Sequence, residues 1–227
     1  MRCIHCGAEA SSLYHVFCGS IKLRECEECS HFIDDLLEVE PMVIGVKLFL
    51  LRRQVYRHLC CNREGPLPLQ VPITLLAMEV FLSWTLCCYE ENFEETGDSF
   101  RWNLFDTTVR VTFGWMAYIA VLYVCLSTFA KFDNYTMSRV FYLVTVSSFS
   151  KLLNIGIVLW SPVEFLVAAA YAAEFYWLLA QFRMLQCTLE RSWLASLLCV
   201  AVAAWAKWTL AASSIPCVVS NQFVDYV

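Results

Sequence analysis

Four cysteines near the N-terminus constrain this chain more than any other feature. They form two C-x2-C pairs with 19 residues between the pairs, and they are Cys3, Cys6, Cys26 and Cys29. Two such pairs at roughly this separation are a signature of a tetrahedral zinc site, because each pair can sit on a tight turn and four thiolates then converge on one ion. The sequence therefore predicts Zn²⁺ as the cofactor and a small zinc ribbon over residues 1–31.

The spacing leaves alternative uses of these cysteines open. Four thiolates fill the coordination sphere, which favours a structural ion over a catalytic one. His5, His31 and Cys18 are spare residues that can replace one cysteine as a ligand. A thioredoxin-like redox motif would need a βαβ pattern around a single C-x2-C pair, and the sequence lacks that pattern. Gly7 directly follows the first pair and tolerates the left-handed backbone that a knuckle requires.

Composition assigns most of the remaining chain to a membrane. Of the 227 residues, 59% are hydrophobic and only 16% are charged, whereas a soluble domain carries about a quarter charged residues. The first 30 residues have no apolar core of a signal peptide, so we expect a reduced, cytosolic head rather than a secreted disulfide scaffold. The sequence shows no arginine-rich run and no basic groove with interleaved aromatics, so nucleic acid is not an expected partner.

Residues 32–63 link the head to the membrane part. Residues 32–40 read as a short amphipathic turn or helix, and Pro41 suits the first turn of a new helix. Residues 42–59 mix apolar and basic side chains and are too short to span a bilayer, but such a helix can lie among lipid headgroups. The candidate lipid or membrane-surface contacts are Lys47, Arg52, Arg53, Tyr56, Arg57 and His58. The alternative is that this segment packs on the head as an ordinary core helix.

The N-terminal motifs together resemble one known family. The cysteine pairs CIHC and CEEC, the connecting SLYHVFCGSIKLREC, the following FIDDLLEVE and the later LLRRQVYRHLCCN are similar to the Arv family (acyl-CoA:sterol acyltransferase-related, required for viability) over about the first 62 residues. The resemblance implies a protein of the endoplasmic reticulum membrane that acts in sterol distribution, sphingolipid balance and the handling of glycosylphosphatidylinositol precursors.

The segment after the proline-containing linker 64–70 reads as a transmembrane helix bundle over residues 71–212. Each candidate span has 18 to 21 residues, which matches the thickness of a bilayer. The five candidate spans cover residues 71–88, 111–130, 140–160, 163–182 and 193–212. The first span carries Glu79 and the third carries Lys151, so either could be a re-entrant segment that does not cross the membrane. The number of spans would then be three or four. The predicted fold class is thus a mainly α membrane protein with a small N-terminal zinc ribbon.

Lysine and arginine placement predicts the orientation. Basic residues concentrate before the first span and in the connections 131–139 and 183–192, whereas the tail 213–227 has none. Five spans then place the head in the cytosol and the tail in the lumen. Asn134 begins a glycosylation-type Asn-Tyr-Thr motif, which this topology leaves on the cytosolic side and unmodified.

Lys151 and Glu174 are the candidate intramembrane polar pair. Spans three and four are joined only by Ser161 and Pro162, so the two charges lie at comparable depths of a helical hairpin. Ionisable residues at membrane depth usually face the bundle interior. The pair either fixes helix register or takes part in ligand binding or transport.

The sequence carries no enzyme signature: it has no nucleophile elbow and no Gly-rich phosphate loop, and its four histidines all precede residue 59. The pairs Cys60–Cys61 and Cys87–Cys88 lie near a membrane edge, where acylation is an option. We therefore expect a non-enzymatic protein that binds or moves membrane lipids, with sterol as the expected partner. The alternative is a scaffold that recruits lipid- or glycosylphosphatidylinositol-synthesis enzymes without binding lipid.

Overall fold

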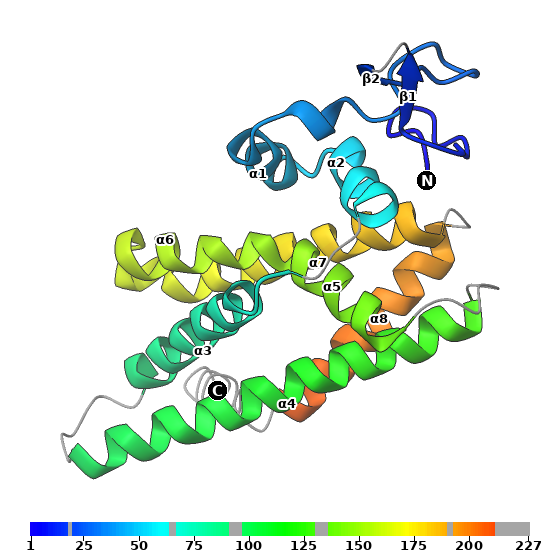
Figure 1. Cartoon of the computed structure of the whole chain (residues 1–227). Helices are drawn as coiled ribbons and strands as arrows, with labels where there is room; N and C mark the ends of the chain where they lie inside the picture. Colours follow the sequence, from blue (N-terminus) through cyan, green and yellow to red (C-terminus); the bar gives the residue numbers. More distant parts are fainter. Residues whose placement is uncertain (18–19, 64–66, 91–96, 130–135, 190–192, 212–227) are drawn as a thin grey trace.

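The chain forms a small head packed on one side of a helical bundle (Figure 1). The structure is a computed structural model, and it describes residues 1–17, 20–63, 67–90, 97–129, 136–189 and 193–211. In chain order its elements are β1 (Tyr14–Phe17), β2 (Ser20–Leu23), η1 (Asp35–Glu38), α1 (Pro41–Phe49), α2 (Arg53–Arg57), η2 (His58–Asn62), α3 (Gln70–Glu90), α4 (Gly97–Phe129), α5 (Met137–Ser147), η3 (Ser148–Leu152), α6 (Leu153–Trp160), η4 (Val163–Phe165), α7 (Leu166–Leu189) and α8 (Trp193–Ala211).

The head is built from two cysteine knuckles and one hairpin. Strands β1 and β2 pair antiparallel, with Val16 opposite Ile21. Single antiparallel bridges close the two knuckles, and a small core forms between them from Cys3, Leu13, Cys26 and Ile33. This is the short-stranded, metal-type architecture that the cysteine spacing predicts over residues 1–31.

The segment after the head forms separate short helices where the sequence suggested one helix over 42–59. Pro41 starts α1 in its first turn, as predicted. The helix then ends, and Leu51 takes a positive φ of 52°. The chain restarts in α2 and continues through one π-helical turn, η2. After the break α2 lies next to the head, whereas α1 lies farther from it (Figure 1).

Four of the five expected spans correspond to helical stretches long and apolar enough to cross a membrane. Within the described residues these stretches are Gln70–Cys88, Leu104–Thr128, Met137–Trp160 and Trp193–Leu210. The remaining expected span, 163–182, falls on η4 and α7. Helix α7 has 24 residues but also carries Glu174, Gln181 and Arg183. It is therefore less apolar than the four stretches above and is not among them. The linker is described only from residue 67, and the tail 213–227 lies outside the described residues.

The third span is broken near its middle. Helix α5 ends at Ser147, the backbone tightens into the 3₁₀ turn η3, and α6 resumes at Leu153. Buried polar groups gather at this turn: Ser147 donates to Gln181 Oε1 at 2.9 Å, and Trp177 and Gln181 donate to Ser148 Oγ at 2.9 and 3.0 Å. Side-chain hydrogen bonds from α7 therefore hold the two serines of this turn in the interior of the bundle.

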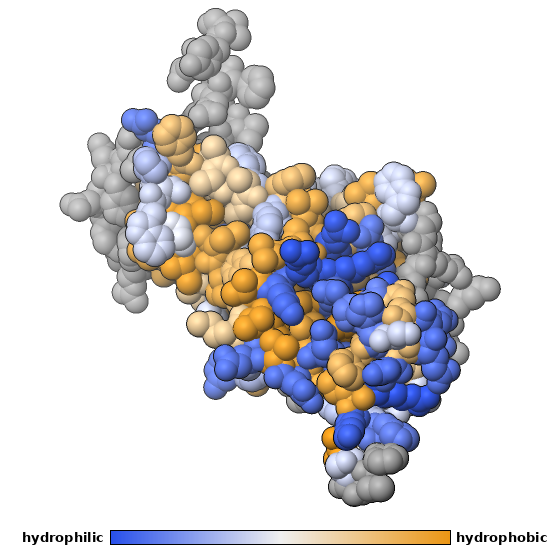
Figure 2. Space-filling view, turned by 90° about the horizontal axis from the view of Figure 1, so that it is seen from above, coloured by the Kyte–Doolittle hydropathy of each residue, from blue (hydrophilic) through white to orange (hydrophobic). Residues whose placement is uncertain are grey.

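One hydrophobic core joins the head to the bundle. It runs from Ile4 and Leu36 in the head through Tyr56 of α2 to Leu143 of α5 and Trp177 of α7. Polar residues gather over the head in the view of Figure 2, and apolar side chains dominate the surface beside it. The head is thus a fixed part of the membrane protein rather than a module on a tether.

Candidate functional site

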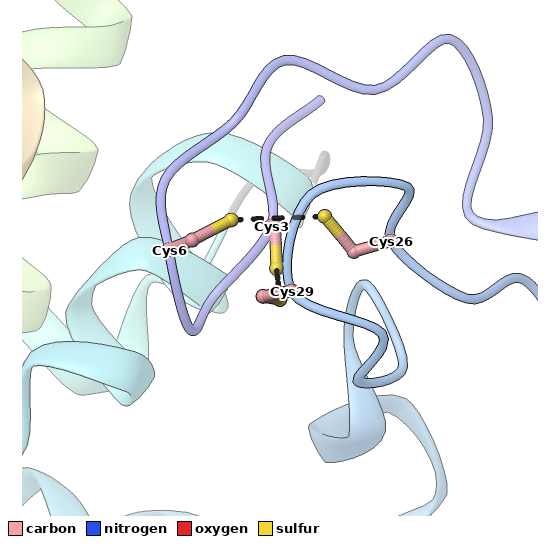
Figure 3. A group of neighbouring side chains, drawn as sticks. All are labelled: Cys3, Cys6, Cys26 and Cys29. Atoms are coloured by element: carbon pink, nitrogen blue, oxygen red, sulfur yellow. Dashed lines mark hydrogen bonds between the residues drawn. The ribbon is translucent and has the colours of Figure 1, made fainter.

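The four predicted metal ligands converge in the head. One sulfur from each of Cys3, Cys6, Cys26 and Cys29 lies within 4.8 Å of all the others. The sulfurs of Cys3 and Cys29 are 3.7 Å apart and those of Cys6 and Cys26 are 3.6 Å apart, and the side chains point toward one another (Figure 3). Sulfurs bound at about 2.3 Å to a tetrahedral Zn²⁺ have separations of this size. The residues therefore fit a four-thiolate metal ion.

The backbone around the quartet also suits a metal. The amide N–H groups of Cys29 and Glu28 lower the pKa of the Cys26 thiol to about 7, whereas the pKa of the Cys6 and Cys29 thiols, which share protons with it, is raised. The thiolate is the form that binds metals, so Cys26 is the thiol of the three that is best suited to bind first. Of the spare ligand candidates, His5 and His31 stack on each other with ring centroids 4.7 Å apart and are not members of the quartet. Cys18 lies outside the described residues.

Arg57 fastens the first knuckle to helix α2. Its Nη1 donates to the carbonyl oxygens of His5 at 2.8 Å and Ile4 at 3.2 Å. Gly7 lies directly against this guanidinium with a φ of 92°, and a Cβ there would be 2.7 Å from Arg57 Nη2. Glycine is thus favoured at this position by its backbone angle, and a side chain here would also make the end of the Arg57 side chain shift.

A second buried contact joins the head to η2 through Asp34. His58 Nδ1 and Asn62 Nδ2 both lie 2.7 Å from Asp34 Oδ2, and Asp34 Oδ1 caps the 3₁₀ turn η1 by accepting from the Leu36 amide at 3.1 Å. Asn62 also exchanges two 2.8 Å hydrogen bonds with the backbone of Arg2. The metal knuckles, η1 and η2 are therefore one hydrogen-bonded unit.

The structure corrects half of the expected membrane-surface contacts. Tyr56, Arg57 and His58 are buried at 1%, 7% and 3% exposure. They pack between head and bundle, as in the alternative that this segment is a core helix. Arg52 and Arg53 are exposed and Lys47 is half-buried, so these three remain available to a membrane surface. Cys60 is buried, and burial raises the pKa of its thiol well above the usual value, which disfavours reaction there.

The bundle brings the predicted intramembrane pair together and extends it to four charges. Lys151 Nζ contacts Glu174 Oε1 directly. Lys151 is also 3.6 Å from Glu79 Oε2, while Lys207 Nζ is 2.5 Å from Glu79 Oε1 and 3.7 Å from Glu174 Oε2. Positive and negative groups alternate around this ring, to which α3, η3, α7 and α8 contribute one residue each. We call these four residues the charge ring.

Two tryptophans enclose the charge ring. Trp115 donates to Glu79 Oε2 at 2.5 Å. The ammonium groups of Lys151 and Lys207 lie 4.6 and 4.3 Å from the ring centroid of Trp177, within the range of cation–π attraction. The sequence marked Glu79 as an ionisable residue in the first span but could not assign its partners, because Lys151 and Lys207 lie on segments distant along the chain.

A cavity opens beside the charge ring. It has a volume of about 460 Å³ and lies among α3, α4, α7 and α8. Its walls are mainly apolar, with Leu82, Leu86, Val167 and Ala170 among them. Its polar end is formed by three of the four charged residues, which are Glu79, Glu174 and Lys207. An apolar cleft with a few convergent polar groups is the usual form of a small-molecule site.

Comparisons with known proteins place residues 2–181 within the model of a family described as Arv1-like. "Protein arv1" of Schizosaccharomyces pombe is 34% identical over 92 residues, which are 37% of this chain and 35% of that protein. Human "Protein ARV1" is 32% identical over 84 residues, 37% of this chain and 31% of that protein. The mouse protein of the same name is 25% identical over 169 residues, which cover 70% of this chain and 63% of that protein.

These relatives are matched over only part of their length. The matched stretches cover about a third of the fission-yeast and human proteins and less than two thirds of the mouse protein. No solved structure matches the chain.

Proposed function

The chain belongs to the Arv1-like family, and from that premise we propose that it binds or moves membrane lipid, sterol in particular, in lipid homeostasis at the endoplasmic reticulum. The proposal includes the sphingolipid and glycosylphosphatidylinositol-precursor balance that the family resemblance implies. The observation that carries it is the apolar cavity of about 460 Å³ between helices suited to a membrane. The proposal assigns no catalytic reaction to the chain.

The metal-bound head would hold the lipid-handling parts in position. We propose Zn²⁺ at the quartet, where it would fix both knuckles and, through Arg57 and Asp34, helices α2 and η2. Helix α1 then presents Met42 and Val46, and its C-cap presents Leu50. These three residues are 80%, 57% and 62% exposed and lie near the exposed bases Arg52 and Arg53 in the chain. Apolar side chains flanked by cations are the composition of an interfacial helix.

We propose that α7 crosses the membrane as a fifth span in addition to the four apolar stretches, which puts the head in the cytosol and the C-terminal tail in the lumen. The support for this topology is the concentration of Lys and Arg before the first span. Asn134 of the Asn-Tyr-Thr motif, which lies outside the described residues, is then expected to stay unmodified. If endoglycosidase treatment of cell lysates showed that Asn134 carries a glycan, the orientation would be the opposite of the one proposed.

The test of lipid binding is photo-crosslinking of purified, zinc-loaded protein in lipid nanodiscs with a photoreactive cholesterol. We expect saturable labelling that unlabelled cholesterol competes away, with labelled peptides from α3, α7, α8 or α1. A transfer assay between vesicles then distinguishes binding from movement. Absence of labelling from protein that is folded by size-exclusion chromatography would contradict the proposal.

A scaffold that recruits lipid- or glycosylphosphatidylinositol-synthesis enzymes is the second candidate. It is favoured by the hairpin of the head, where Val16 and Ile21 face each other in register at 68% and 70% exposure. Exposed apolar side chains mark a protein contact when they belong to a larger contiguous patch, of which this pair would be a part. A scaffold should co-purify with stoichiometric partners, and V16D should release them without changing lipid labelling.

A further inference from the structure

We propose that the charge ring is the headgroup site of the cavity, and that its ligand is a membrane lipid with an uncharged hydroxyl headgroup rather than a phospholipid. The inference rests on the proposed lipid-binding function and specifies its site and its selectivity. Three observations carry it: the free acceptor on Glu174, the balanced charge of the ring, and the apolar walls beyond it.

Glu174 is the member of the charge ring with an unused acceptor. Its Oε1 contacts Lys151, while its Oε2 accepts no hydrogen bond from the residues that the structure describes and lies 3.7 Å from Lys207 Nζ. The Glu174 side chain is 26% exposed, against 7% for Glu79, and it lines the cavity. The terminal torsion of a glutamate is soft, so a small rotation presents Oε2 to a ligand. A hydroxyl group donates the hydrogen bond that this carboxylate lacks.

The two lysines are already engaged and do not offer a phosphate site. Lys207 is only 4% exposed, bonds Glu79 at 2.5 Å, and lies under the ring of Trp177. Lys151 is 1% exposed and contacts both glutamates. Two ammonium groups and two carboxylates leave no net charge, so an anionic headgroup would add an unbalanced charge in a medium of low dielectric constant, at a large cost.

The cavity walls suit the body of the same lipid. Among the lining residues, Leu86 comes from α3, and Val167 and Leu178 come from α7. The volume of about 460 Å³ falls within the roughly 300–1,000 Å³ of small-molecule sites. Polar groups at one end and apolar walls elsewhere match an amphipath with one small polar end.

Selectivity among competitors tests the headgroup rule on the unmodified protein. In nanodiscs, photoreactive cholesterol is competed with cholesterol, cholesterol methyl ether, dioleoylglycerol and phosphatidic acid. We expect cholesterol and dioleoylglycerol to compete, and the methyl ether, which cannot donate, to compete about tenfold or more weakly, as loss of a hydrogen bond to a charged group predicts. Phosphatidic acid should compete as weakly. Equal competition by all four lipids would overturn the headgroup rule while leaving lipid binding intact.

Matched substitutions test the location. Ala170 lines the cavity, whereas Ala168 is exposed on the same helix. We expect A170L to fill the cavity and reduce labelling at least about tenfold, and A168L to label like the unmodified protein. E174Q should remove the preference for the free hydroxyl over the methyl ether, with the exposed Glu164 as its control in E164Q.

The outcomes separate the two proposals. Labelling that A170L leaves unchanged would place the lipid elsewhere and refute the site, but not lipid handling. Absence of saturable labelling in folded protein would refute both. Because A170L alters no charge, it keeps the test decisive even if E174Q fails to assemble.

Discussion

At the scale of single residues, Gly7 and Arg57 decide how the metal knuckle meets the membrane part. The sequence predicted the left-handed turn at Gly7, and its φ of 92° confirms it. It did not predict that the Arg57 side chain fills the space where a Cβ would lie. That contact joins residues that are distant along the chain, and nothing in the local pattern of either segment specifies it.

Replacing Gly7 with alanine should therefore destabilise the head. The left-handed angle alone costs about 1–2 kcal/mol with a side chain, and the contact with Arg57 adds to it. G45A is the control, because Gly45 is helical and its Cβ would meet Phe149 at an ordinary 3.8 Å. We expect G7A to lower the melting temperature and the zinc occupancy, measured by differential scanning fluorimetry and metal analysis. Equal melting of G7A and G45A would contradict the role of Gly7.

Loss of one cysteine of the quartet should abolish metal binding. Structural zinc sites in small peptides contribute ~10–16 kcal/mol of apparent binding free energy, so three ligands cannot hold the head in its fold. We expect C3S and C26S to purify without zinc and to expose the head to limited proteolysis, whereas C125S in α4 keeps its metal. A C26S protein with full zinc and an intact head would refute the assignment.

At the scale of elements, the segments between head and bundle show where sequence reasoning stops. The pattern of residues 42–59 predicted one basic amphipathic helix, and the structure forms only its first half as the helix α1. The buried half, α2 and η2, carries Arg57, His58 and Asn62, which look solvent-exposed in sequence because their partners are on the head. Likewise, hydropathy located the span 140–160 but not the turn η3 inside it, because Ser147 and Ser148 depend on Gln181 and Trp177.

Arg57→Ala should detach the head from α2. It removes two charge-assisted hydrogen bonds and leaves the buried carbonyls of Ile4 and His5 without their donor, an expected loss of about 2–3 kcal/mol. R53A is the control, because the Arg53 side chain is exposed. Hydrogen-exchange mass spectrometry should show faster exchange across residues 1–38 in R57A only. Unchanged exchange in R57A would contradict this role and show that Asp34 and the shared core are enough to hold the head on α2.

At the scale of the whole molecule, the charge ring ties four segments of the bundle together. Sequence placed Lys151 and Glu174 at similar depth in a hairpin, and the structure brings them into contact. The partners on α3 and α8 follow only from the tertiary fold. Breaking a buried ion pair leaves an uncompensated charge and costs about 3–5 kcal/mol, so the ring should dominate the assembly of the bundle.

Charge reversals should show the alternation of the ring. K151E and E174K should each reduce the yield of monodisperse protein, measured by fluorescence-detected size exclusion of a tagged chain. The double reversal restores the net charge of zero. It also puts a carboxylate at position 151 beside Glu79, where Lys151 Nζ is now 3.6 Å away, and an ammonium group at position 174 beside Lys207, which is now 3.7 Å from Glu174 Oε2. Only part of the yield should therefore return. Adding E79K and K207E restores the alternation and should recover more. Full recovery of the yield in the double variant would show that Lys151 and Glu174 act as an isolated pair and that the other two members of the ring do not matter.

The ring also has a consequence for biosynthesis. Each of the four segments brings one charge that finds opposite charges only on other segments, and the first and last of these, α3 and α8, are 128 residues apart at Glu79 and Lys207. During synthesis, Glu79 therefore meets its first opposite charge only when Lys151 of η3 emerges, and its 2.5 Å partner Lys207 only when α8 emerges. The charge ring is therefore complete only after the last of its four segments has been made, and a chain that ends before α8 lacks the partner that lies 2.5 Å from Glu79.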